Sequence, residues 1–196
     1  MPHAAEPMDA VILAGGRGQR MGGLDKPSLV IAGTSLLDRV LAACADCVTV
    51  VVVGPERPTG RPVEFAHESP PGGGPVAALA AGLPHVTAAT VALLAADLPF
   101  LTAPVLAALQ SHLATGDGAL LVDDTGRDQL LAGVWRTSAL RSLVEGAGPP
   151  QGLALSRLLS GLSFLRVAAA ELGTYGPEPW RDCDTPEDLR RAEELA

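Results

Sequence analysis

Short runs of apolar residues alternate with helix-like segments along most of this chain, and this order restricts the folds open to it. Residues 10–13, 48–53 and 90–95 are rich in Val, Leu, Ile and Ala, as in strands that are covered on both faces. Strands that alternate with helices build a mostly parallel sheet with helices on both sides. The order therefore predicts an α/β fold, a three-layer α/β/α sandwich of the Rossmann-like type with a mostly parallel central sheet.

The remaining elements follow from the same periodicities. We expect further strands at residues 63–66, 119–122, 130–135 and 163–167. We expect helices at residues 36–45 (capped by Thr34 or Ser35), 76–83, 103–113 (capped by Thr102), 138–144 and 153–159. With 196 residues, 47% of them hydrophobic, the chain is long enough for one sizeable core. Residues 9–196 are expected to form a single domain, and residues 1–8 a flexible tail.

Charge and hydropathy exclude several classes of protein. The net charge of −8 argues against non-specific binding to nucleic acid. No apolar span reaches the roughly 18 residues of a membrane helix. The first residues, MPHAAEPMDA, lack the basic region and apolar stretch of a secretory signal. A soluble, cytoplasmic protein without nucleic-acid or membrane partners is expected.

A glycine-rich, basic loop follows the first apolar run. Residues 13–27 read LAGGRGQRMGGLDKP and combine five glycines with Arg17, Arg20 and Lys26. Glycine lets the backbone approach a ligand closely, and successive N–H groups can form an anion-binding concavity. Basic side chains add charge-assisted hydrogen bonds. The loop predicts phosphate binding, the simpler alternative being a flexible, positively charged surface loop.

Two common phosphate-binding motifs do not fit this loop. A P-loop requires Lys followed by Ser or Thr, whereas Lys26 lies between Asp25 and Pro27. The dinucleotide-binding motif G-x-G-x-x-G begins at Gly16 but has Met21 at its last position. The loop must therefore belong to another class of phosphate site.

The order of residues in the loop resembles that of GT-A-like nucleotidyltransferases. It is most similar to the molybdenum cofactor guanylyltransferases, in which the loop has the form LAGG…RMGG.DK. LAGG alone also opens sugar-phosphate nucleotidyltransferases, whereas the RMGG-x-DK continuation is more specific. The resemblance extends from residue 10 to about residue 190 and implies a fold of the nucleotide-diphospho-sugar-transferase type. It implies that the nucleotide is bound by Leu13, Ala14, Gly15 and Gly16, with Arg20 and Lys26 stabilising phosphate charge.

An acidic residue follows the apolar run of residues 90–95. Open α/β sheets bind ligands beyond the carboxyl ends of their strands, and a carboxylate there can hold Mg²⁺ together with substrate phosphates. Asp97 occupies this place, although an Asp that begins a turn before Pro99 would look the same. The resemblance implies that Asp97 binds the metal and the nucleotide.

A second glycine run, in PPGGGPVAAL, precedes the predicted helix at residues 76–83. Its backbone could read the edge of a flat base, or it could be an ordinary loop that ends in proline before a helix. In the family that the loop resembles, this segment binds nucleotide and follows an acidic residue. The resemblance assigns nucleotide contacts to Gly73 and Gly74. It also assigns one to Glu68, at a position where relatives more often have Asp.

A segment near the end of the chain matches the family less closely than the loop does. Thr185, Pro186 and Asp188 satisfy a helix N-terminus without any ligand. Relatives often have N-x-N-T-P-E in this segment, on the acceptor side of the cleft, but this chain carries Asp182 and Asp184 in place of the two amides. The resemblance points to acceptor contacts from these residues and from Arg127, which could equally be a solvated turn residue.

Three cysteines complete the chemically informative residues. Cys44 and Cys47 form a CxxC, which is found in redox and zinc sites. No second pair or nearby histidine completes a metal set, so we interpret them as small buried apolar residues. We interpret Cys183 as a packing residue.

The resemblance implies transfer of GMP from GTP to the phosphate of molybdenum-molybdopterin, with release of pyrophosphate and with Mg²⁺ as cofactor. The acceptor phosphate is already a nucleophile at neutral pH, so the site needs alignment and charge neutralisation more than a general base. GTP and a molybdopterin-type acceptor are the expected partners, and molybdoenzyme maturation proteins are a further option. The alternatives are a CTP-dependent cytidylyltransferase, a phospholactate guanylyltransferase and a non-catalytic nucleotide-binding protein.

Overall fold

The computed structural model describes residues 6–15, 25–69, 71–172 and 178–196. The strands are β1 (Met8–Leu13), β2 (Val30–Ile31), β3 (Thr34–Ser35), β4 (Val50–Val53), β5 (Glu64–Ala66), β6 (Thr90–Ala95), β7 (Gly118–Val122), β8 (Asp128–Arg136) and β9 (Phe164–Ala168). The α-helices are α1 (Leu36–Ala43), α2 (Pro75–Gly82), α3 (Ala103–Ser111), α4 (Thr137–Gly146), α5 (Leu155–Leu159) and α6 (Pro186–Leu195). Short 3₁₀ helices are η2 (Lys26–Ser28), η3 (Leu83–His85), η4 (His112–Thr115) and η5 (Ala169–Leu172).

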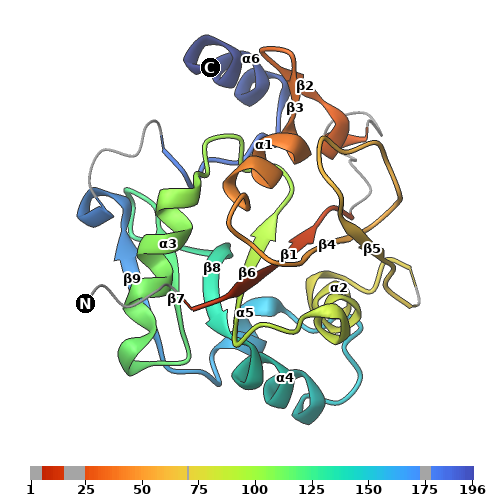
Figure 1. Ribbon diagram of the computed structural model, residues 1–196, viewed down its shortest axis with the longest axis vertical. Helices are drawn as coiled ribbons and strands as arrows, with labels where there is room; N and C mark the ends of the chain where they lie inside the picture. Colours follow the sequence, from red (N-terminus) through yellow and green to blue (C-terminus); the bar gives the residue numbers. More distant parts are fainter. Residues whose placement is uncertain (1–5, 16–24, 70, 173–177) are drawn as a thin grey trace.

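A seven-stranded sheet with the order β5-β4-β1-β6-β8-β7-β9 runs through the middle of the molecule (Figure 1). Strands β5, β4, β1 and β6 pair in parallel, as do β7 and β9. Strand β8 runs antiparallel to both of its neighbours, β6 and β7. The prediction of a mostly parallel sheet is confirmed.

Helices cover both faces of the sheet, with α1 and α3 on one side and α2, α4 and α5 on the other (Figure 1). The alternation of side chains along β1 explains why both faces are apolar. Ala10 and Ile12 pack in the cluster under α1 and α3, and Val11 packs in the cluster under α2, α4 and α5. The predicted three-layer sandwich is confirmed.

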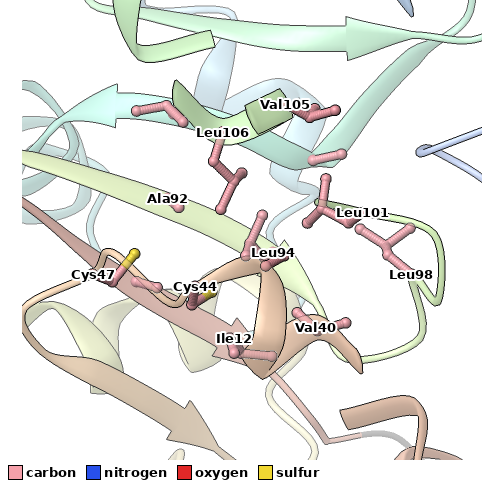
Figure 2. Packing of buried hydrophobic residues seen from close by; sticks show 14 of the residues in the cluster. Ile12, Val40, Cys44, Cys47, Ala92, Leu94, Leu98, Leu101, Val105 and Leu106 are labelled. Carbon is pink, nitrogen blue, oxygen red and sulfur yellow. The ribbon is translucent and has the colours of Figure 1, made fainter. Parts of the chain in front are cut away.

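The cluster under α1 and α3 contains both cysteines of the CxxC. Figure 2 shows Cys44 and Cys47 pointing in among Ile12, Ala92 and Leu94. A hydrogen bond that the Cys44 thiol donates to the Cys47 side chain, together with burial, raises the pKa of the Cys44 thiol well above its ordinary value. A thiol that stays protonated is a poor nucleophile and metal ligand. The expectation that both cysteines are buried core residues is confirmed.

Two differences from the expected elements concern the N-terminal part of the chain. Strand β1 begins at Met8, because this residue continues the parallel pairing with β6 opposite Thr90. Met8 therefore belongs to the strand and not to the expected tail. The β2–β3 hairpin was not expected, since its strands have two residues each and leave no periodic pattern. Its turn holds Ala32 and Gly33 at positive φ.

The C-terminal helix α6 packs beside this hairpin (Figure 1). The expected capping box is confirmed: the Thr185 hydroxyl accepts from the Asp188 N–H, and the Asp188 carboxylate accepts from the Thr185 N–H. Cys183 is fully buried here with Ile31 and Phe100, so its interpretation as a packing residue is confirmed. Among the described helices, none is long and apolar enough to cross a membrane.

A buried carboxylate ties together the amino ends of the three central parallel strands. Asp9 is fully buried, and its oxygens accept from the backbone N–H groups of Thr49 at 2.8 Å, Thr87 at 2.6 Å and Ala88 at 2.8 Å. Thr49 precedes β4, and the other two residues precede β6. A carboxylate accepts at both oxygens, whereas an amide would turn a donor toward some of these N–H groups.

We predict that Asp9→Asn lowers the free energy of unfolding by about 2–3 kcal/mol, because it leaves buried donors unsatisfied. The melting temperature should fall by about 5–10 °C. Asp9 lies at the opposite edge of the sheet from the site described below, so the folded variant should keep its nucleotide affinity. A melting temperature equal to that of the wild type would contradict this role for Asp9.

Candidate functional site

The candidate site lies at the carboxyl edge of the parallel strands. Strands β1, β4, β5 and β6 all end at this edge. From β1 the chain moves outward to β4 and β5 and then returns to place β6 on the other side of β1, so the strand order reverses between β1 and β6. Open α/β sheets bind their ligands at such a reversal. Ala14 and Gly15 follow β1 and Asp97 follows β6, so the predicted nucleotide-binding backbone and the predicted metal ligand flank this point.

Lys26 joins three distant parts of the chain at this edge. Its ammonium nitrogen donates to Oδ2 of Asp97 and lies 2.5 Å from Oδ1 of Asp184. Burial alone would lower the pKa of Lys26, but the carboxylates of Asp97 and Asp184 outweigh it and raise the pKa above its ordinary value. The side chain is therefore a fully charged ammonium at neutral pH, even though only 17% of it is exposed.

Asp97 has one oxygen that fits a metal ion. Its Oδ2 pairs with Lys26, whereas its Oδ1 is buried and has no hydrogen-bond partner among the described residues. Buried polar atoms are normally partnered, so this oxygen marks a place for a further donor or cation. The described residues contain no group of three or more His, Cys, Asp or Glu side chains that could hold a metal by itself. Mg²⁺ usually binds one or two carboxylates together with substrate phosphates, and Asp97 with Asp184 nearby is such a donor set.

The segment of residues 182–184 enters the site because its middle residue is anchored. Cys183 is buried under α6, and Asp184 on one side of it reaches the ammonium of Lys26. Burial and the charges of Asp184 and Asp97 raise the pKa of Asp182. From the sequence, Asp182 and Asp184 were expected on the acceptor side. In the structure, Asp184 contacts the ammonium of Lys26, which also pairs with Asp97.

The raised pKa of Asp182 makes a pH-dependent prediction. A carboxyl whose pKa is raised by folding binds its proton more tightly in the folded state, so its contribution to stability is greatest below the unfolded pKa and is lost as the pH rises through the folded pKa. Asp182→Asn, which imitates the protonated form, should therefore raise the melting temperature at pH 7 by about 2 °C. The difference should shrink as the pH is lowered toward 4. Equal melting temperatures at pH 7 would contradict the cost of burying the ionised Asp182 beside Asp184 and Asp97.

The second glycine loop lies at the same edge, after β5. The backbone has positive φ at Gly72 (81°) and Gly74 (91°), where a side chain would be strained, and Gly74 caps α2. The carbonyl of Gly73 accepts from the N–H of Gly152 at 3.1 Å. The Glu68 carboxylate accepts from the N–H of Gly72 at 2.8 Å, so in this structure Glu68 holds the loop in shape.

The other predicted residues are placed as follows. Arg127 lies in the turn between β7 and β8, at the same edge and directly before β8, the strand that pairs with β6. The Asp123 carboxylate orders this turn by accepting from the Arg127 N–H at 3.0 Å. Leu13 ends β1, whereas Gly16 and Arg20 lie outside the described residues.

Comparison with known proteins agrees with this geometry. Residues 10–163 match the family model of the MobA-like NTP transferase domain. The chain belongs to this family. The molybdenum cofactor guanylyltransferase of Acidiphilium cryptum is 30% identical over 195 residues, which cover 94% of this chain and 93% of the relative. The family resemblance stated from the loop is thus confirmed.

Solved structures of other proteins share the fold of this MobA-like transferase. The molybdopterin-guanine dinucleotide biosynthesis protein A of Archaeoglobus fulgidus superposes with a TM-score of 0.76 at 25% identity, covering 95% of this chain and 97% of that one. The 2-C-methyl-D-erythritol 4-phosphate cytidylyltransferase of Thermus thermophilus has a TM-score of 0.71 at 21% identity, with 95% and 97% covered. The second likeness shows the shared nucleotidyltransferase fold alone.

Two residues that contact the start of the glycine-rich, basic loop of this MobA-like transferase were not predicted from the sequence. Gly54 directly follows β4 at a φ of 149°, and a Cβ there would lie 2.8 Å from the carbonyl carbon of Ala14. Arg57 lies further along the same connection and donates to the carbonyl of Ala14. A glycine immediately after a run of four valines was a usable signal for Gly54. An arginine in a turn-rich stretch gave no comparable signal.

Proposed function

We propose that this protein transfers GMP from GTP to the phosphate of molybdenum-molybdopterin, producing the guanine dinucleotide cofactor and pyrophosphate. The observation that carries the proposal is the meeting of Lys26 and Asp97 at the strand reversal, beside the backbone of Ala14 and Gly15. The guanylyltransferase relative of similar length supports the choice of donor and acceptor. The product is a cofactor, so the proteins that mature molybdoenzymes are its proposed recipients.

The reaction is a substitution at the α-phosphorus of GTP. An oxygen of the acceptor phosphate forms the new P–O bond while the bond to the β-phosphate breaks, and pyrophosphate leaves with the electron pair. The nucleophile is already ionised, so no side chain has to remove a proton. The protein contributes alignment and neutralisation of phosphate charge.

The predicted residues other than Glu68, which accepts from the N–H of Gly72, have roles in this scheme. The backbone of Leu13, Ala14, Gly15 and Gly16 would hold the nucleotide, and Lys26 and Arg20 would neutralise the triphosphate. Asp97 would hold Mg²⁺ with Asp184 beside it, and the bound ion would draw charge from the phosphate oxygens. Gly73 and Gly74 would contact the base, while Asp182 and Arg127 would face the acceptor.

The donor base can be tested without the acceptor. Ligand binding to the folded state raises stability by about 2.7 kcal/mol at 100 times the dissociation constant. In the presence of Mg²⁺, GTP should therefore raise the melting temperature by several degrees, and CTP should not. Stabilisation by CTP alone would overturn the choice of GTP and favour a cytidylyltransferase.

A further inference from the structure

The segment between β4 and β5 carries a buried arginine that the chemistry above does not use. The side chain of Arg57 is only 6% exposed. Its Nη1 donates to the carbonyl of Ala14 at 3.3 Å, and its Nη2 donates to Oδ1 of Asp25 at 3.0 Å. Charged side chains are rarely this buried unless they are paired or hold a specific geometry.

The two partners of Arg57 lie on either side of the phosphate-binding loop. Ala14 is the first residue after β1, and Asp25 directly precedes Lys26. The two are far apart along the loop, yet a single guanidinium donates to both. Its planar fork presents donors in a fixed arrangement, so it fixes the separation of its two acceptors.

Further contacts fix Ala14 and Asp25, the two residues that Arg57 bridges. The N–H of Ala14 donates to the carbonyl of Val53 at 2.9 Å, and Gly54 leaves room for the Ala14–Gly15 peptide to pass closely. At the other end, Asp25 caps the turn that carries Lys26: its carbonyl accepts from the Ser28 N–H at 3.0 Å, and its carboxylate accepts from the Ser28 hydroxyl. Movement of Asp25 would therefore move Lys26.

We infer that Arg57 is a positioning residue of the nucleotide site, which sets the place of Lys26 relative to Ala14 and Asp97. The identity of the nucleotide in this inference rests on the proposed function. The contacts of Arg57 do not depend on it. The inference predicts that loss of Arg57 disturbs Lys26 even in the absence of any substrate.

The chain offers a direct probe of Lys26 and a matched control. Lys26 is the only lysine in the sequence, so an amine-reactive ester modifies it and the N-terminal amine alone, and peptide mapping separates the two. Arg61 lies on the same connection and also donates from its guanidinium to backbone carbonyls, those of Cys44 at 2.5 Å and Cys47 at 3.4 Å. These carbonyls belong to the end of α1 and the turn after it, and not to the site.

The experiment compares Arg57→Met and Arg61→Met with the wild type at matched fractions of folded protein. In Arg57→Met, Lys26 should be modified several-fold faster, and kcat/KM with Mg²⁺–GTP should fall roughly tenfold to a hundredfold, as displaced binding groups do. Arg57→Lys, which keeps one contact, should have an intermediate kcat/KM; because it adds a second lysine, only this readout is used for it. Arg61→Met should lower the melting temperature with both readouts unchanged.

Equal Lys26 modification rates in the two methionine variants would overturn the inference and leave Arg57 a purely structural residue. If Arg57→Met does not fold, Asp25→Ala removes the side-chain acceptor of Arg57 from the exposed side and must accelerate Lys26 modification instead. A normal modification rate in Asp25→Ala contradicts the inference as well. Failure of the proposed function would appear as absence of GTP turnover in the wild type, without any effect on the modification rates.

Discussion

Asp97→Asn is expected to lower kcat/KM by about 10³-fold, equivalent to about 4 kcal/mol of transition-state stabilisation. The amide keeps the shape of the side chain but removes the charge that pairs with Lys26 and that would hold a divalent cation. The buried Oδ1 of Asp97, unpartnered among the described residues, is the atom on which the effect depends. Pyrophosphate release from GTP in the presence of Mg²⁺ and the acceptor measures the loss.

Asp184→Asn is the matched control for this variant. Asp184 contacts the same ammonium, but 41% of its side chain is exposed, so its charge is screened by water. We expect a loss of about fivefold or less, since exposed ion pairs contribute about 1 kcal/mol or less. A folded Asp97→Asn variant whose kcat/KM stays within about tenfold of the wild type would remove Asp97 from the proposed mechanism.

Lys26→Met is expected to lower kcat/KM by about 10²- to 10³-fold, as the loss of one preorganised charge contact at a reacting group does. The loss should appear in kcat more than in KM, because the proposed mechanism has the ammonium neutralise charge that builds up on the phosphates. Lys26→Arg should recover only part of the activity, since a guanidinium is larger and pairs with carboxylates differently. Initial rates over a range of GTP concentrations separate the two constants.

We expect that the proposed site requires a lysine, and not an arginine, at position 26. Of its 14 cationic Lys and Arg side chains, only Lys26 is a lysine. An ammonium is a compact point charge that can exchange a carboxylate for a phosphate oxygen. Full activity in Lys26→Arg would contradict this reasoning, and full activity in Lys26→Met would contradict the role of the charge.

The pKa of Lys26 adds a stability test to the same variant. The folded state raises this pKa above its ordinary value of 10.5, so the ion pairs stabilise the protein fully below that pH. Their contribution is lost as the pH rises through the folded pKa. The difference in stability between wild type and Lys26→Met should therefore be constant near neutral pH and shrink only under strongly alkaline conditions.

Sequence patterns predicted the parts of the fold that depend on local chemistry. The expected bounds of β6 are those observed, because its apolar run ends at the Ala96–Asp97 turn. Ser35 caps α1 and Thr185 caps α6, since both side chains have a backbone N–H three residues on to accept from. The edge of the sheet at which the site lies also followed from the sequence, because loops after parallel strands share one edge.

The contacts that assemble the site could not be predicted, because they depend on tertiary structure. The Lys26–Asp184 pair spans 158 positions, and no local pattern records that the segment of Asp184 would pass over the end of β6. Asp9 and Arg57 are buried charges whose partners include backbone groups of other segments. Backbone groups carry no sequence signal, so these residues resemble ordinary surface charges until the fold is known.

The most direct test of the proposed function is incubation of the protein with Mg²⁺, GTP and molybdopterin that carries molybdenum. We predict release of pyrophosphate together with a guanine dinucleotide product, and loss of both in Asp97→Asn. Binding of GTP without any dinucleotide product from this acceptor would contradict the account. A product formed only from CTP would contradict its choice of donor.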